Sequence, residues 1–319
     1  MTILAIESSC DEFSVAIMVD GQIKANIISS QIEDHTIYGG VIPELASRLH
    51  VKNFGWVLSA AIQESQITFE QIDCIAYTAN PGLIGSLIVG KLVAETLALY
   101  LNVPLMPLNH IQGHIYGANI EEKFEYPLLA LVVSGGHTQI QYLEKPLDFK
   151  IIGTTQDDAI GECYDKVARS LGLGYPGGPK IDKFAQNGDE NKYALPFPKN
   201  DSSYDFSYSG LKTASLNLIN KLKQNGEEIN ISDFCASFQK TAVDTVISKL
   251  ERAIKEFKPK SITVAGGVSA NNLIRKKLNE LGSMYNIDRI VIPNIKYCTD
   301  NAAMMAELCN EYLKIKQNG

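Results

Sequence analysis

The chain has 319 residues, of which 45% are hydrophobic and 20% are charged. Such a composition is typical of a soluble globular protein, and the length predicts two packed lobes rather than one. The formal net charge of −7 argues against a protein that grips nucleic acid on its own, because such proteins are usually basic.

Three further features bear on the compartment. The six cysteines are scattered without a Cys-x-x-Cys pair, so we expect no disulfide framework and a reducing cytoplasm. The start "MTILAIESSCDEF" has no basic leader and predicts no signal peptide. The most apolar run, 83–108, is long enough to span a bilayer, but Lys91 and Glu95 interrupt it; it predicts a buried helix followed by a strand.

The first half of the chain predicts strands alternating with helices. A strand at 2–9 leads into a hairpin over 13–29, with Asp20-Gly21 as its turn. A helix over 50–65 and a strand over 72–82 follow. The apolar helix at 84–101 and a strand at 103–109 then deliver the chain to a helix beginning "NHIQGHIYGAN".

The second half predicts a similar series. It opens with strands at 127–136 and 137–144 and continues with a long amphipathic helix at 233–257. A strand then runs into a glycine turn at 261–271, followed by a helix at 271–285, a strand at 289–293 and a closing helix at 299–316. This alternation predicts an α/β architecture. Both halves open as strand, small-residue turn and strand, so we expect an internal duplication around a cleft, with lobes at 1–125 and 126–319.

His110 and His114 form a candidate metal site. Residues four apart lie on one face of a helix, so both imidazoles can reach one ion. The protease motif HExxH requires a glutamate after the first histidine, where this chain has Ile111, so a metalloprotease is disfavoured. Two structural histidines on a partly buried helix are an equally plausible reading of the pair alone.

A third metal ligand is available in "YCTDNAAMM". Asp300 opens the last helix, where an N-cap or a first-turn acid is the ordinary role. Two imidazoles and this carboxylate would form a set suited to Fe(II) or Zn(II).

Small residues follow three apolar strands, in "ESSCDE", "VVSGGHT" and "VAGGVSAN". Backbone N–H groups at such turns can approach phosphate oxygens, which favours a nucleotide cleft over plain tight turns. None of the three matches a P-loop or a Rossmann fingerprint. In "GECYDKVARSLGLGYPGGPKID", Asp165 could bind ribose hydroxyls or orient an acyl donor, while a solvated helix face explains Glu162 and Lys166 equally well.

In sequence order, "ESSCDE", "YGGVIPELASRLH", "PGLIGSL", "NHIQGH", "VVSGGHTQ", "GECYDK", "YPGGP", "FSYSGLKT", "AGGVSAN" and "CTDNAAM" resemble the bacterial tRNA N6-adenosine threonylcarbamoyltransferases, once mislabelled as sialoglycoproteases. The resemblance covers nearly the whole length. It implies a duplicated actin-like ATPase (ASKHA) fold, in which the second lobe carries a helical insertion and its last helix supplies Asp300. It also implies transfer of a threonylcarbamoyl group from its adenylate to the adenosine 3′ to the anticodon, in tRNAs reading codons that begin with A.

Carried over by motif, the resemblance implies one Fe(II), or alternatively Zn(II), bound by His110, His114 and Asp300. It implies substrate contacts at Val132, Val133, Ser134, Gly135, Gly136, Asp165, Gly178, Asp182 and Asn271, and a catalytic role for Asp11. The implied partners are tRNA, a homologous inactive subunit (TsaB-like) and a small P-loop ATPase (TsaE-like). A kinase or Hsp70-like ATPase with the same fold is the alternative function.

Overall fold

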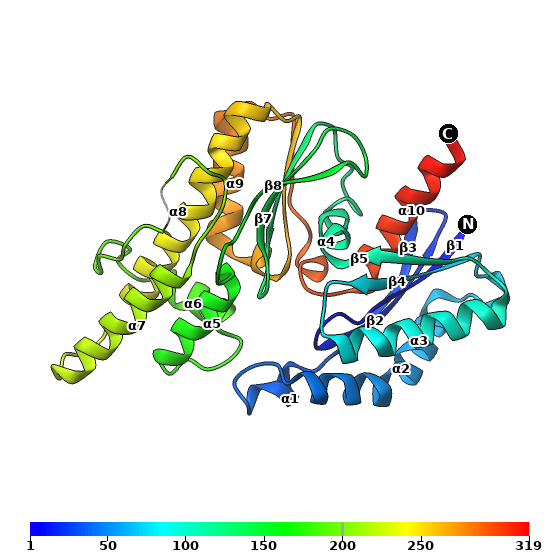
Figure 1. Cartoon of the computed structure of the whole chain (residues 1–319), viewed down its shortest axis with the longest axis horizontal. Helices are drawn as coiled ribbons and strands as arrows, with labels where there is room; N and C mark the ends of the chain where they lie inside the picture. The colour runs from blue at the N-terminus through cyan, green and yellow to red at the C-terminus, as the bar shows by residue number, and fades with distance from the viewer. Residues whose placement is uncertain (199–200, 319) are drawn as a thin grey trace. The chain divides into compact units, whose positions relative to one another are not determined.

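The computed structural model describes residues 1–198 and 201–318. These divide into two compact units, Met1–Lys123 with Pro293–Gly319 and Phe124–Ile292. Each unit is built on one five-stranded mixed sheet. Helices flank the sheet in each unit (Figure 1).

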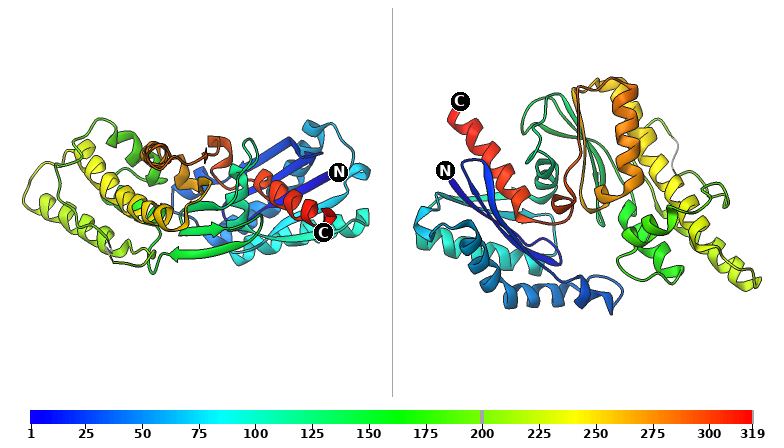
Figure 2. Two further views of the ribbon diagram at one scale, coloured as in Figure 1. Left: turned by 90° about the horizontal axis from the view of Figure 1, so that it is seen from above. Right: turned by 180° about the vertical axis from the view of Figure 1, so that it is seen from behind.

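In the first unit the sheet has the order β3-β2-β1-β4-β5, with β1 antiparallel to β2 and parallel to β4. Helices α2 and α3 cover one face, and α4 and α10 cover the other (Figures 1 and 2). The elements are β1 (Thr2–Glu7), β2 (Glu12–Val19), β3 (Gln22–Ser30), α1 (Ile32–Thr36), α2 (Pro43–Ser65), η1 (Phe69–Gln71), β4 (Cys74–Asn80), α3 (Ile84–Leu101), β5 (Leu105–Asn109), α4 (His110–Ala118), η3 (Ile295–Tyr297) and α10 (Ala302–Asn318).

The second unit repeats this topology in the order β8-β7-β6-β9-β10, with β6 antiparallel to β7 and parallel to β9. Its elements are β6 (Leu128–Val133), β7 (Thr138–Leu143), β8 (Phe149–Thr154), α5 (Ile160–Ser170), α6 (Gly177–Ala185), α7 (Ser209–Gln224), α8 (Ile231–Phe257), β9 (Ser261–Ala265), η2 (Gly267–Ala270), α9 (Asn272–Met284) and β10 (Arg289–Val291). The predicted α/β class and the duplicated opening are confirmed.

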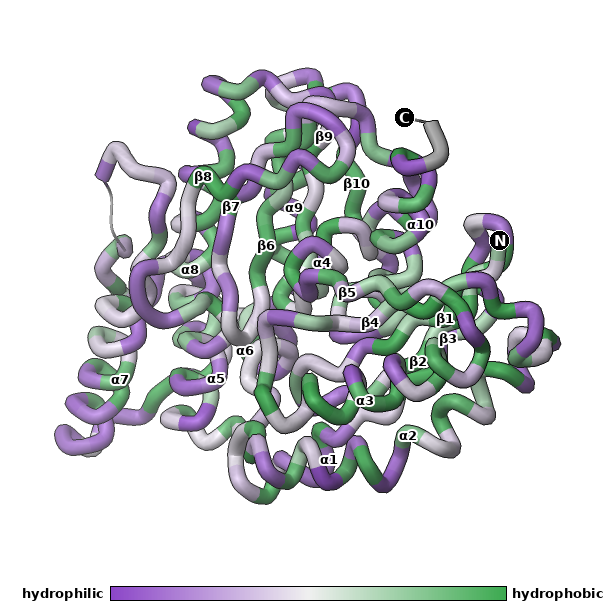
Figure 3. The backbone as a smooth tube through the Cα atoms, turned by 45° about the vertical axis from the view of Figure 1, so that its right-hand side comes forward, coloured by the Kyte–Doolittle hydropathy of each residue, from purple (hydrophilic) through white to green (hydrophobic). Residues whose placement is uncertain are grey.

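Local chemistry accounts for the shared opening of the two units. Every residue of β1 and of β6 is buried, which explains why both strands are near-continuous apolar runs; Figure 3 shows β6 in the hydrophobic colour. In the first unit Asp20 and Gly21 adopt positive φ angles of 49° and 78° between β2 and β3. Two residues at positive φ give a two-residue hairpin turn, as predicted.

The expected division of the chain differs from the observed one at its end. The predicted boundary at 125/126 places the closing helix, α10, in the second lobe. In the structure, α10 packs against β1, β2 and α4 of the first unit. The physical reason is its burial: most of its first ten residues are fully covered, and the apolar surface that covers them is the face of the first sheet.

Helix α3 is where it was predicted, but it is not a buried helix. Its small residues Ser86, Gly90, Ala94 and Ala98 recur every four positions and face inward. Five large apolar residues point outward: Ile84, Ile88, Leu92, Leu99 and Tyr100. By length and composition α3 is also apolar enough to cross a membrane, yet only 22% of it is buried. Apolar content alone does not say which face of a helix is covered.

Candidate functional site

The two histidines of α4 are positioned by an N-cap. Asn109 Oδ1 accepts hydrogen bonds from the N–H groups of Ile111 (2.9 Å) and Gln112 (3.1 Å), so the helix begins at His110. His110 and His114 follow one turn apart, and their ring centroids lie 4.5 Å from each other. Both side chains are buried.

Asp300 lies beside this pair, two residues before α10. Its Oδ1 atom is 3.1 Å from His114 Nε2 and 3.6 Å from His110 Nε2. The expected alternative role as an N-cap belongs instead to Asn301, whose Oδ1 accepts the Met304 N–H at 3.2 Å. One donor atom from each of His110, His114 and Asp300 falls within 4.8 Å of the other two.

Glu7, a residue the sequence reasoning did not single out, completes this cluster. It ends β1, is fully buried, and its carboxylate accepts from Ser9 N–H at 2.6 Å and from the Thr78 hydroxyl. Its Oε2 lies 3.1 Å from His110 Nδ1. When the His110 ring is neutral, a carboxylate beside Nδ1 keeps the proton on that nitrogen and leaves the Nε2 lone pair for a metal ion. The available signal was a glutamate at the end of an otherwise apolar strand.

The cluster carries excess negative charge. Burial alone lowers the pKa of His110, but the charges of Glu7 and Asp300 outweigh it and raise this pKa to about 9. The pKa of the Asp300 carboxyl is lowered despite its burial, because His110 and His114 favour its charged form. The pKa of Glu7 is also lowered, against the effect of burial, mainly by His110. Two ionised carboxylates therefore face the histidines, which favours a bound cation.

The residues present fit a metal ion. Neither ring nitrogen of the buried His114 makes a hydrogen bond within the described parts of the chain, although Nε2 lies close to Asp300. Leaving a buried polar atom unpaired is costly, and a metal ion would use such a lone pair. Two imidazole nitrogens and a carboxylate oxygen form a donor set typical of Fe(II) or Zn(II) sites with open positions.

Asp11 lies in the turn that follows β1 and is buried. Its neighbour Glu12 has a pKa raised well above its ordinary value, first by burial and then by the charges of Asp11 and Asp300. The charge of Asp300, from the other end of the chain, therefore acts on an acid of "ESSCDE".

In the second unit, the equivalent turn follows Val132 and Val133. Ser134 N–H donates to His137 O at 2.8 Å, which closes the turn. A Cβ built on Gly135 or Gly136 would meet no atom within 4 Å, so both glycines border open space.

Two close contacts hold this turn in place. A Cβ on Gly161 of α5 would lie 2.6 Å from Ser134 O, and one on Gly266 would lie 2.5 Å from Val133 O. Gly266 also has a positive φ of 88°. The two predicted glycine turns are thus neighbours, and the absence of side chains allows both approaches.

Asp165 mainly serves helix α6. Its Oδ1 accepts the Gly177 N–H at 2.7 Å. Burial raises the pKa of this carboxyl, while the N–H groups of Gly177 and Gly178 oppose the shift. A Cβ on Gly178 would meet no atom within 4 Å, so this glycine also borders open space.

Asp182 and Asn271 are buried and belong to one hydrogen-bonded group. Asn271 is the N-cap of α9, and its Oδ1 accepts from Leu273 N–H and Ile274 N–H. The side chain of Gln239 connects Asn271 to Asp182. Of the predicted second-unit residues, Val132 to Gly136, Gly178 and Asn271 therefore lie at a strand end or a helix start, whereas Asp165 and Asp182 lie within α5 and α6. In the first unit, His110, His114 and Asp300 lie in one largely buried cluster.

Comparison with known proteins gives a consistent result. The family model described as TsaD, tRNA N6-adenosine threonylcarbamoyltransferase, matches residues 22–307. A protein of that name from Mycoplasma capricolum is 62% identical over 316 residues, covering 99% of both chains. One from Bacillus subtilis is 46% identical over 310 residues, covering 96% of this chain and 89% of its own.

The chain belongs to this family. The predicted family and enzyme class are thereby confirmed. Similar solved structures confirm the predicted actin-like fold. Full-length HypF has a TM-score of 0.65 at 12% identity, covering 98% of this chain and 46% of its own. Component A of the (R)-2-hydroxyglutaryl-CoA dehydratase of Acidaminococcus fermentans has a TM-score of 0.58 at 13% identity, covering 98% and 99%.

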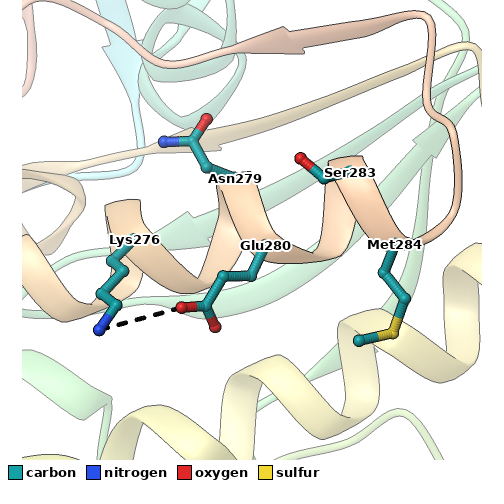
Figure 4. A pocket seen from close by; sticks show the side chains of 5 residues that line it. All are labelled: Lys276, Asn279, Glu280, Ser283 and Met284. Atoms are coloured by element: carbon teal, nitrogen blue, oxygen red, sulfur yellow. Dashed lines mark ion pairs between the residues drawn. The ribbon is translucent and has the colours of Figure 1, made fainter.

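The basic run Arg275-Lys276-Lys277 has local partners on or beside α9. Arg275 Nε donates to Ser269 O at 2.8 Å, and both lysines lie within 4.0 Å of Glu280. Figure 4 shows the side chains that line a pocket along α9, from Lys276, Asn279, Glu280, Ser283 and Met284. It contains none of the predicted site residues.

Proposed function

We propose that the chain transfers the threonylcarbamoyl group of threonylcarbamoyl-AMP to the N6 amine of the adenosine 3′ to the anticodon, in tRNAs reading codons that begin with A. The amine nitrogen attacks the acyl carbon of the mixed anhydride, the bond to AMP breaks, and AMP leaves. The observation that carries this proposal is the largely buried set of His110, His114 and Asp300, in a sequence that has Ile111 where the protease motif requires a glutamate.

His110 Nε2, His114 Nε2 and an Asp300 oxygen would hold one divalent ion, which we propose is Fe(II), with Zn(II) as the alternative. When bound, such an ion supplies a Lewis acid and an anchor for the threonylcarbamoyl group. Glu7 keeps the His110 ring oriented through Nδ1. Asp11 accepts the proton that leaves the attacking amine, which is a weak nucleophile because its lone pair is delocalised into the purine.

The second unit binds the AMP part of the donor in this proposal. The turn from Val132 to Gly136 at the end of β6 is assigned to the phosphate, chiefly through the N–H groups of Gly135 and Gly136, and the dipole of α9 adds to the attraction. Asp165, Gly178, Asp182 and Asn271 contact the rest of the donor. The open space at Gly135, Gly136 and Gly178 supports this assignment, because a ligand can reach those backbones closely.

We propose that tRNA binds with the aid of the TsaB-like subunit and the TsaE-like ATPase, in the cytoplasm. The net charge of −7 leaves little attraction for a polyanion. The outward face of α3 supports docking of the homologous subunit on the first unit: Ile84, Leu99 and Tyr100 are 78%, 84% and 81% exposed. Large apolar side chains exposed along one helix are typical of an interaction surface, and the exposed ion pair of Lys91 and Glu95 on α3 would form part of it.

A single-turnover assay tests the function. It combines the purified chain, both helpers, threonylcarbamoyl-AMP and unmodified tRNA, with nucleosides read by mass spectrometry. We expect modified adenosine, and we expect it to disappear with a chelator and to return when the metal is restored. No product would favour the alternative, an ATPase or small-molecule kinase of the same fold, whose ATP turnover would not depend on His110. Product unaffected by metal removal would leave the two histidines as structural residues.

A further inference from the structure

Gln239 occupies the middle of a buried polar chain in the second unit. It projects from α8, is 5% exposed, and lies between Asp182 on α6 and Asn271 at the start of α9, which are 8% and 7% exposed. Its Nε2 donates to Asp182 Oδ1 at 3.0 Å, and its Oε1 accepts from Asn271 Nδ2 at 2.9 Å. Three helices thus meet through one amide side chain.

The N-cap hydrogen bonds of Asn271 fix the direction of the hydrogen bonds from Asn271 through Gln239 to Asp182. The Asn271 Oδ1 accepts two backbone N–H groups of α9, each at 3.1 Å, so its Nδ2 must face Gln239. Gln239 therefore presents Oε1 to Asn271 and Nε2 to Asp182. On its other oxygen, Asp182 accepts from Asn272 Nδ2 at 2.6 Å. Only a side chain that both accepts and donates fits position 239.

We infer that Gln239 is a positioning residue for the nucleotide part of the donor, which it serves by fixing the Asp182 carboxylate and the Asn271 amide relative to each other. This inference rests on the proposed function, which assigns Asp182 and Asn271 to donor binding. Asp182 Oδ1 accepts one bond from the protein, from Gln239, and has a second lone pair for a hydroxyl group of the ligand. Asp182 Oδ2 accepts two bonds from Asn272, from the backbone N–H at 3.3 Å and from Nδ2 at 2.6 Å, which hold the carboxylate in place. Asn271 similarly has a second N–H group to donate.

The test measures AMP binding by calorimetry and donor KM and kcat in the transfer assay, on the full chain. Gln239→Met keeps the length and volume of the side chain but neither donates nor accepts. We expect about tenfold to a hundredfold weaker AMP binding and a matching rise in donor KM, with a smaller change in kcat. Gln239→Glu should bind at least as weakly, because its carboxylate would face Asp182.

Thr245→Val is the matched control. Thr245 is a fully buried polar residue of the same helix, and its hydroxyl donates to the Thr241 carbonyl at 2.8 Å. This variant should bind AMP as the unaltered protein does. A double-mutant cycle supplies a second test. Gln239→Met should add little to the loss of AMP affinity already caused by Asp182→Asn, because both substitutions act on the Asp182 carboxylate.

The outcomes distinguish a failure of the role inferred for Gln239 from a failure of the proposed function. Normal AMP binding by a folded Gln239→Met or Gln239→Glu protein overturns this inference and leaves the proposed function intact. Additive losses in the cycle also overturn it, since they mean that Gln239 does not act through Asp182. Failure of the unaltered protein to bind AMP overturns the proposed function, and this inference with it.

Discussion

The turn after β1 and the turn after β6 occupy equivalent places in two sheets of the same topology, yet their chemistry is opposite. The first contains buried polar residues, Ser8, Ser9 and Asp11, next to two ionised carboxylates. The second contains Gly135 and Gly136, which carry no side chain and border open space. Duplication has preserved the backbone framework, while the side chains at the turn have made one copy suited to a cation and the other to a ligand that accepts from backbone N–H groups.

The largest expected effect is a loss of metal affinity when the charged cluster of the first unit is altered. Asp300→Asn and His114→Ala should each reduce metal affinity by more than the roughly 10- to 100-fold that follows loss of a partner of a ligand. Metal content after dialysis measures this. His50→Gln is the control, because His50 is also a buried histidine but bonds to Gln31. AMP binding should change in none of the three; equal loss of metal in the control would contradict the assigned ligands.

Gly161→Ala should disturb the turn after β6 in the second unit and leave the first unit unaffected. The added Cβ would lie 2.6 Å from Ser134 O and 2.9 Å from Gly135 N, both backbone atoms that cannot move freely. We expect a loss of about 1–3 kcal/mol in the free energy of unfolding and weaker AMP binding, with metal content unchanged. Denaturant titration and calorimetry measure both. Gly210→Ala is the matched control, because its Cβ would meet no atom within 4 Å; similar losses in both variants would rule out the contact as the cause.

A smaller change sharpens the role of charge in the first turn. Glu7→Gln keeps the shape and an oxygen acceptor for His110 Nδ1, but it removes one of the two carboxylates that face the histidines. Metal affinity should fall about 10- to 100-fold. Competition with a chelator of known affinity gives the value. If affinity were unchanged, Asp300 alone would supply the charge that the ion requires.

The smallest expected effect is a pH dependence confined to the first unit in the metal-free protein. The pKa of His110 is raised to about 9, above the ordinary value of 6.5. The stabilisation that this provides is fully present below pH 6.5 and is lost as the pH rises through 9. The thermal midpoint, measured with a chelator, should therefore fall between pH 6.5 and pH 9.5. This fall should be larger for the unaltered protein than for Glu7→Gln. An equal fall in both proteins would assign the pH dependence to other groups.

Much of this arrangement could be read from the sequence because it depends on local signals. Asp20-Gly21 predicts its hairpin, Asn109 predicts the start of α4, and the spacing of His110 and His114 predicts their shared helix face. The repeated strand and small-residue turn predicts the duplication. Each of these rests on residues only a few positions apart.

The rest depends on contacts between distant parts of the chain. Helix α3 has too many large apolar residues for periodicity to reveal that its small residues face the core. Glu7 becomes informative only once His110 is known to lie beside it. By residue type alone, Asp300 and Asn301 are equally good N-caps. The structure of α10 shows that Asn301 takes that role.

The return of the chain to the first sheet also sets an order of events during synthesis. Asp300 follows His110 by about 190 residues, which at ribosomal speed corresponds to about 10–40 s. During that interval the nascent first unit already has both imidazoles and Glu7 but lacks Asp300, the third ligand that we propose. With that ligand set, binding of the ion would be a late event, completed only after the second unit has been translated in full.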